Sequence, residues 1–136
     1  MAAWPATRMS TMPSVSASIL PCVSWIDATA VAVGDFNSDG IPDLTFLYHP
    51  PGPFRTNNLM VLLGNGDGTF RTAQDITLNE SPMTLTAADV NGDGQLDLLL
   101  LTFFPSTINI LLGNGDGTFL AAVGSYSLPD SPNSWW

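Results

Sequence analysis

The nine residues LLGNGDGTF occur twice in this chain, at Leu62 to Phe70 and, unchanged, at Leu111 to Phe119. A stretch repeated without change inside one chain indicates a duplicated structural unit. The Asn-Gly and Asp-Gly pairs within it supply the positive φ angles that tight turns between antiparallel strands require. The stretch therefore predicts the same hairpin turn, between two strands, in each of two units.

A second stretch, rich in aspartate, precedes each copy of the turn. Asp35 to Asp43 reads DFNSDGIPD, and Asp89 to Asp97 reads DVNGDGQLD. These stretches begin 54 residues apart and the turns begin 49 residues apart, and the difference of five corresponds to an insertion around residues 50–54. Each unit is therefore about 50 residues long.

The segments between these turns are short and rich in Val, Ile, Leu, Thr and Phe, which is typical of β-strands. We expect strands near residues 29–35, 44–48, 59–63 and 70–77 in the first unit, and near 84–89, 98–103, 108–112 and 119–127 in the second. The second strand of each unit is almost continuously apolar, so it should be covered on both faces. The first strands carry small residues, as expected where sheets crowd together. The sequence predicts an all-β fold with four antiparallel strands per unit.

The composition excludes several classes of protein. The 136 residues are 45% hydrophobic and carry 12 acidic against 3 basic residues, for a formal net charge of −9. Nucleic-acid binding is not expected, because it needs basic residues to neutralise phosphates. No apolar run reaches the roughly 18 residues of a membrane span, and no signal peptide is legible at the start. The single cysteine, Cys22, excludes an internal disulfide.

The two acid-rich stretches have the spacing of a calcium loop. Oxygen-bearing side chains stand at loop positions one, three, five and nine, with a glycine at position six that allows a sharp bend, and the carbonyl of position seven adds a fifth oxygen. Half of the acidic residues lie in these loops, and neither loop contains a basic residue to offset them. The predicted ligands are Asp35, Asn37, Asp39, the Ile41 carbonyl and Asp43 in the first loop, and Asp89, Asn91, Asp93, the Gln95 carbonyl and Asp97 in the second.

Other metals and other loop types fit these residues less well. The helix-loop-helix calcium hand needs a glutamate at position twelve, where this chain has Phe46 and Leu100. The absence of His and Cys from the loops argues against zinc and copper, and Mg²⁺ holds to strict octahedral geometry. Ca²⁺ is therefore the expected cofactor. The alternative is that Asp, Asn and Gly form an Asx-rich turn that binds no metal.

The pairing of these loops with GNGDGTF resembles the FG-GAP or VCBS repeat, the calcium-binding blade of integrin-α-type β-propellers, over roughly residues 28–127. The resemblance implies a β-propeller fragment of two four-stranded blades, a calcium loop between the first two strands of each, and an extracellular setting. We assign residues 1–27 to an N-terminal segment holding the last strand of a preceding blade, 28–79 and 80–129 to the two blades, and 130–136 to the start of a third. Only two blades can be recognised in this sequence, whereas β-propellers have several.

No set of residues suggests catalysis. The single histidine, His49, lies among prolines, and the remaining acids outside the loops and turns show no paired spacing: Asp27, Asp75, Glu80 and Asp130. We therefore expect a non-enzymatic, calcium-binding module of a secreted or cell-surface protein that binds a protein or carbohydrate ligand, as in cell adhesion. The alternative is a set of non-catalytic blades in a larger secreted enzyme such as a polysaccharide lyase or hydrolase. In either case two blades leave apolar faces open, which predicts self-association or contact with further blades.

Overall fold

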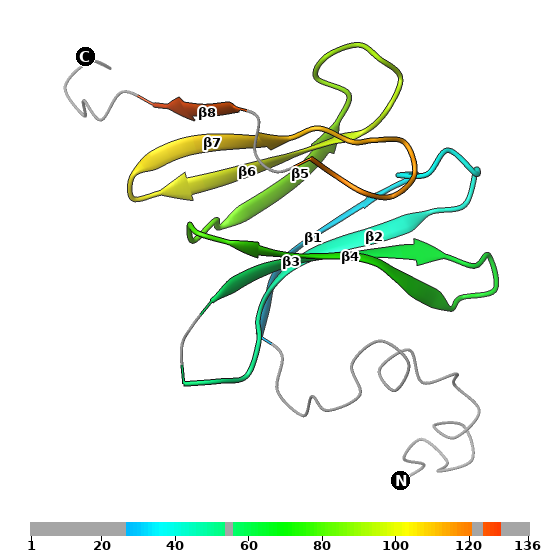
Figure 1. Cartoon of the computed structure of the whole chain (residues 1–136), viewed down its shortest axis with the longest axis horizontal. Helices are drawn as coiled ribbons and strands as arrows, with labels where there is room; N and C mark the ends of the chain where they lie inside the picture. Colours follow the sequence, from blue (N-terminus) through cyan, green and yellow to red (C-terminus); the bar gives the residue numbers. More distant parts are fainter. Residues whose placement is uncertain (1–26, 54–55, 121–123, 129–136) are drawn as a thin grey trace, which may run out of the picture.

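The computed structural model describes residues 27–53, 56–120 and 124–128. In this part of the chain, strands form two four-stranded antiparallel sheets and there is no helix (Figure 1). Sheet 1 contains β1 (Asp27–Gly34), β2 (Asp43–His49), β3 (Asn57–Gly64) and β4 (Phe70–Leu78). Sheet 2 contains β5 (Thr84–Ala88), β6 (Asp97–Phe103), β7 (Ser106–Leu111) and β8 (Gly124–Ser127). The all-β prediction is confirmed.

Strand order follows chain order in both sheets, so each sheet is a meander joined by short connections. Seven expected strands lie within two residues of their predicted bounds. For the eighth, the structure describes an isolated bridge between Phe119 and Gly113 and then β8 from Gly124. Residues 121–123 of the expected strand lie outside the described ranges.

The loops and turns lie where the repeat predicts them. Residues 35–42 connect β1 to β2, residues 89–96 connect β5 to β6, and the two GNGDG turns follow β3 and β7. In the turns, the Asn65 N–H donates to the Thr69 carbonyl at 2.9 Å, and the Asn114 N–H donates to the Thr118 carbonyl at 2.9 Å. All four Gly-Asp-Gly glycines have φ between 79° and 90°. The acid-rich loops and the turns therefore share one end of each sheet.

The two sheets pack face to face, and their side chains form the main core. Its buried members come from both sheets and from the two loop-turn ends: Phe36, Leu47, Leu59, Val61, Leu85, Leu98, Leu100, Leu111 and Phe119. The first strands, β1 and β5, lie next to each other where the sheets meet (Figure 1). Ala30, Ala32 and Ala87 pack against the core there, because small side chains let the two backbones approach. This confirms the expected crowding at the first strands.

The second strands differ in how far their outer faces are covered. In β2, Leu47 is buried toward sheet 2, whereas Tyr48 is buried on the opposite face with Met60 and Leu62. In β6, Leu98 and Leu100 are buried, but the alternate residues 99 and 101 are half-exposed. On the outer face of β2, Leu44 and Phe46 are only half-buried, so burial on both faces is incomplete in β2 as well as in β6.

Two expectations concern residues outside the described ranges. They are the last strand of a preceding blade, expected before residue 27, and the beginning of a third blade at 130–136. Within the described ranges, no helix has the length and apolar character needed to cross a bilayer.

Candidate functional site

In the first acid-rich loop, the side chains of Asp35, Asn37 and Asp39 each accept a hydrogen bond from the loop's own backbone. The Asp35 carboxylate accepts the N–H groups of Asp39 at 3.1 Å and Gly40 at 2.8 Å. Asn37 accepts the Asp39 N–H through Oδ1 at 3.2 Å, and its Nδ2 donates to Asp39 Oδ2 at 2.8 Å. Asp39 Oδ1 accepts the Ile41 N–H at 2.8 Å. The predicted ligands at positions one, three and five are therefore held together around a single tight bend.

The second loop repeats this pattern. The Asp89 carboxylate accepts from the N–H groups of Gly92 and Gly94, at 2.8 and 2.9 Å. Asn91 bonds Asp93 through both its oxygen and its nitrogen, each at 3.1 Å, and Asp93 Oδ1 accepts the Gln95 N–H at 2.8 Å. Two loops of different sequence thus adopt one geometry, because the shared Asp, Asn and Gly positions dictate it.

The ninth-position aspartates have a different environment. Asp43 and Asp97 are both 0% exposed. Asp43 accepts the Phe36 N–H at 2.7 Å and the Gly64 N–H at 2.8 Å, and Asp97 accepts the equivalent N–H groups of Val90 and Gly113, both at 2.9 Å. Each carboxylate therefore ties its loop to the start of the neighbouring GNGDG turn. This contact could have been predicted from the repeat, because the ninth-position aspartate and the first glycine of the GNGDG turn occur in both units.

Hydrogen bonds inside the GNGDG turns depress the pKa of their aspartates. Asp67 accepts both the side-chain hydroxyl and the backbone N–H of Thr69, and Asp116 accepts the same pair from Thr118. These bonds favour the ionised carboxylate and lower the pKa of both Asp67 and Asp116. The contacts support the prediction that these aspartates serve turn formation.

The first loop also contacts the second repeat directly. The Gly117 N–H donates to the Phe36 carbonyl at 3.0 Å, and the rings of Phe36 and Phe119 pack edge to face with centroids 5.5 Å apart. Ser38 Oγ donates to Gln95 Oε1 at 3.1 Å. Ser38 has φ of 60°, a left-handed conformation that is uncommon for residues other than glycine, and the second loop has Gly92 at this position. The two acid-rich loops, which belong to different sheets, are therefore in contact. The spacing of the predicted ligands along the sequence could not predict this contact.

The oxygens of the loops suit a hard cation in chemistry and charge. Each loop offers carboxylates, an amide oxygen and a backbone carbonyl, which are the ligand types that Ca²⁺ takes. Among the described residues, the Arg71 guanidinium donates to Asn65 Oδ1, in a turn, and no ion pair neutralises a loop carboxylate. A carboxylate has about four lone-pair sites, so the bonds to backbone N–H groups leave acceptor capacity on each.

The carboxylates are not gathered into an all-acid cluster. Across the described ranges, no three Asp, Glu, His or Cys side chains converge as a metal group. In each loop the ninth-position carboxylate is held by backbone N–H groups, and the other predicted ligands include an asparagine and a backbone carbonyl. The assignment of the ten residues as metal ligands therefore stays a prediction.

The fold and the loops together define a β-repeat protein of the propeller-blade type, with two consecutive four-stranded antiparallel sheets and one acid-rich loop in each. Residues 35–100 match the FG-GAP-like repeat. This part of the chain, which includes both acid-rich loops, belongs to the FG-GAP-like repeat family.

Comparison with curated proteins finds a relative that is an enzyme. The chain is 36% identical over 81 residues to the phosphatidylinositol-glycan-specific phospholipase D of Bos taurus. The match covers 53% of this chain and 10% of the relative, so the chain spans about a tenth of the relative's length. No solved structure matches the chain.

Proposed function

We propose that this chain is a calcium-binding repeat module of a secreted or cell-surface protein and that it serves binding to a protein or carbohydrate ligand, as in adhesion. The observation that supports it best is the repeated loop geometry. Two loops of different sequence arrange the same oxygen groups at the same hairpin, without a basic side chain among the described residues to offset their charge.

In this proposal the ten predicted ligands hold one Ca²⁺ ion in each loop. The ion would supply positive charge to offset the repulsion between the loop carboxylates. The chain's own contribution is to keep the ligands close: Asp43 and Asp97 anchor each loop to a turn, and the inter-sheet contacts of Phe36 and Ser38 join the two loops. Calcium would therefore rigidify one end of both blades, and ligand recognition would take place elsewhere on the surface.

The expected affinity favours an extracellular setting. The loops lack the bidentate glutamate of the high-affinity calcium hand, and extracellular calcium modules bind with Kd values of roughly 10⁻⁴ to 10⁻³ M. We expect Kd values between about 10⁻⁵ and 10⁻³ M, so that millimolar extracellular calcium would occupy about half or more of the sites. Membership of residues 35–100 in the FG-GAP-like repeat family supports the same setting.

We further propose that the repeats themselves are not catalytic. The His49 ring contacts the backbone carbonyl of Thr56 at 3.2 Å, and Asp75 accepts hydrogen bonds from Tyr48 and Asn58. These contacts do not pair the histidine with a carboxylate, an arrangement typical of hydrolytic sites. This supports a binding role for the described part of the chain.

A second candidate is that these repeats are part of a larger enzyme. The observation that favours it is the similarity to a phospholipase D of which this chain covers only a tenth. The reading frame on either side of this sequence distinguishes the two candidates. An adjoining catalytic domain would support the second, and further repeats alone would support the first.

Calorimetric titration of the folded protein with CaCl₂ tests the metal proposal. We expect two binding events, and D39A and D93A should each abolish one and leave the other, because each loop draws its ligands from its own repeat. D116A is the matched control, since it removes an aspartate from a GNGDG turn and should leave both events. An absence of calcium-dependent heat in folded protein at millimolar calcium would exclude the proposed ligands.

A further inference from the structure

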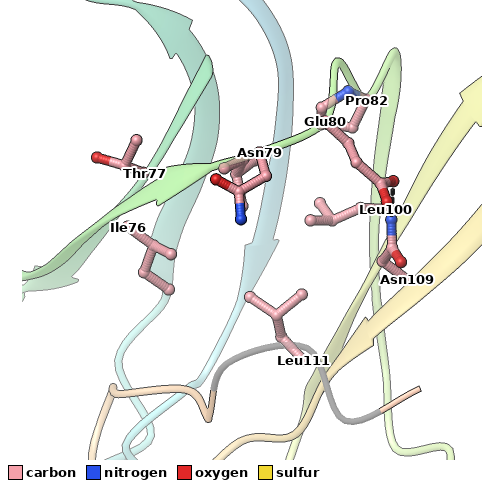
Figure 2. Close-up of a pocket in the computed structure, with 9 residues that line it drawn as sticks. Ile76, Thr77, Asn79, Glu80, Pro82, Leu100, Asn109 and Leu111 are labelled. Carbon is pink, nitrogen blue, oxygen red and sulfur yellow. Dashed lines mark hydrogen bonds between the residues drawn. The ribbon is translucent and has the colours of Figure 1, made fainter. Parts of the chain in front are cut away.

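A small cavity lies between the two sheets, beside the segment that joins β4 to β5 (Figure 2). Its volume is about 190 Å³. Pockets that enclose a whole drug-sized ligand usually measure about 300–1,000 Å³, whereas one water molecule occupies about 30 Å³. The cavity therefore has room for a single long side chain rather than for a complete small molecule of that size.

Most of the cavity wall is aliphatic. Figure 2 shows Ile76 from sheet 1 and Leu111 from sheet 2 pointing toward the space between the sheets, and Leu78 and Leu100 complete this surface. Leu100 and Leu111 are 2% and 1% exposed, so this surface is fixed by the main core. The described lining contains no aromatic ring, which disfavours stacking of a sugar ring or caging of a quaternary ammonium group.

One side of the cavity is acidic and polar. The Glu80 carboxylate receives a hydrogen bond from Asn109 Nδ2 (Figure 2). It receives a second one from Thr107 Oγ1 at 3.2 Å. Both donors bond the same oxygen, Oε2, so Oε1 is the oxygen without a hydrogen bond from the described residues. Asn79 also lines the cavity, and Figure 2 shows its amide directed into the space. The polar side therefore offers a negative charge and amide oxygens to an occupant.

Charge decides which kind of side chain fits. An anion would be repelled by Glu80, and an apolar chain would leave Oε1 of the carboxylate without a hydrogen-bond donor in a mostly aliphatic space. A lysine side chain matches both surfaces, because its four-carbon stem packs on aliphatic groups while its ammonium group donates to oxygen acceptors. This chain carries a net charge of −9 and contains no lysine, so another copy of it cannot supply that side chain.

We propose that this cavity binds a lysine side chain of a protein partner, with its stem against Leu100, Leu111 and Ile76 and its ammonium group at Glu80. This inference deepens the proposed function. It rests on one part of that function, namely that the module binds a protein ligand. The protein partner would therefore present a basic surface, and the recognition site would lie apart from the acid-rich loops.

The test is an NMR titration of the full chain with Nα-acetyl-lysine N-methylamide in calcium-containing buffer. We expect saturable shifts for the amides of Glu80, Asn109 and Leu111. The norleucine analogue, which has the same stem without the ammonium group, should give none. E80Q, which keeps an acceptor for Asn109 but removes the charge, should weaken binding about tenfold or more, because charge-assisted hydrogen bonds are about twice as strong as neutral ones.

D75N is the matched control. It makes the same change of net charge within β4, shortly before the segment that holds Glu80. Asp75 bonds Tyr48, on the face of sheet 1 that is turned away from sheet 2, so D75N should leave lysine binding unchanged. Equal binding of the norleucine analogue, or equal weakening by E80Q and D75N, would overturn the proposal. Thermal melting of each variant shows that it is folded. Calcium titration of the same samples reports on the loops separately, so the two proposals fail independently.

Discussion

Asp43 and Asp97 combine full burial with a negative charge, and their only described partners are backbone N–H groups of a loop and a turn. Removing such an acceptor leaves two donors unsatisfied, at about 1–3 kcal/mol each. We expect D97A to lower the free energy of unfolding by about 3 kcal/mol, measured by urea denaturation in the presence of chelator. D97N, which keeps one acceptor oxygen, should lose less.

D93A provides the comparison, because Asp93 is exposed and bonds only within its loop. In chelator we expect D93A to lower the free energy of unfolding by less than about 1 kcal/mol, in the range typical of surface substitutions. Similar losses for D97A and D93A would show that the buried carboxylate does not anchor the loop to its turn.

Tyr48 should make stability fall at high pH. Burial, followed by the hydrogen bond to Asp75, raises the pKa of the Tyr48 phenol to about 12. The folded protein therefore holds this proton more tightly than the unfolded chain, in which tyrosine titrates near about 10. The stabilisation is complete below about pH 10, and the free energy of unfolding should fall between about pH 10 and 12, by up to about 1.4 kcal/mol per pH unit.

Denaturant unfolding at a series of pH values measures this effect. Y48F should flatten the decline between about pH 10 and 12, because it removes the titrating proton and keeps the ring. A decline of the same slope in Y48F would assign the effect to other groups.

The two GNGDG turns have the same sequence but different surroundings. Gly68 and Gly117 have φ of 90° and 88°, so a side chain at either is strained by about 1–2 kcal/mol. A Cβ at Gly68 would meet nothing within 4 Å, whereas one at Gly117 would lie 2.7 Å from a methyl carbon of Leu63 in the other sheet.

We expect G117A to destabilise the protein more than G68A, by about 1 kcal/mol or more, because Leu63 must shift in a packed interface. Thermal or urea unfolding of the two variants measures the difference, and each variant is the control for the other's backbone strain. Equal losses would mean that the second turn does not pack against sheet 1 as described.

Local features of the fold, such as the turns and the acid-rich loops, were predictable because the same sequence pattern occurs in both repeats. LLGNGDGTF places a turn without reference to the rest of the molecule, and the acid-rich stretches lie at the hairpins that their spacing predicts. Contacts between the sheets were not predictable. Gln74, for example, bonds the Phe119 backbone through both its amide oxygen, at 2.7 Å, and its amide nitrogen, at 3.2 Å, across 45 residues.

The candidate sites show the same limit. Loop spacing identifies which side chains lie near a common point, but it does not give the direction of a carboxylate, and both oxygens of Asp43 accept backbone N–H groups. Likewise, no contact or function of Glu80 could be predicted from the sequence. Its bonds to Thr107 and Asn109 depend on how the segment after β4 crosses to the second sheet.

At the scale of the whole molecule, the described residues include exposed apolar side chains in both repeats. Val31 and Val33 on β1 are 63% and 61% exposed, and Phe103, Phe104 and Tyr126 of the second repeat are 47%, 99% and 61% exposed. Exposed apolar groups of this kind favour association. We expect the 136-residue polypeptide to self-associate at micromolar concentration in calcium, as measured by size-exclusion chromatography with light scattering.

V31T/V33T should reduce this association, because it replaces apolar groups on β1 with β-branched polar ones that suit a strand. A monodisperse, folded monomer of the unmodified polypeptide would show that the exposed surfaces do not drive association.

Thermal melting with and without calcium tests most directly whether these repeats are calcium-binding blades. A ligand that binds only the folded state stabilises it by RT ln(1 + [L]/Kd), about 2.7 kcal/mol at a hundredfold excess over Kd. For a domain of this size we expect a hundredfold excess of Ca²⁺ over Kd to raise the Tm by on the order of 10 °C relative to chelator. The D39A/D93A double variant should show little of this shift. Coincident melting curves of the unmodified protein in calcium and in chelator would contradict the account and leave the two loops as Asx-rich turns.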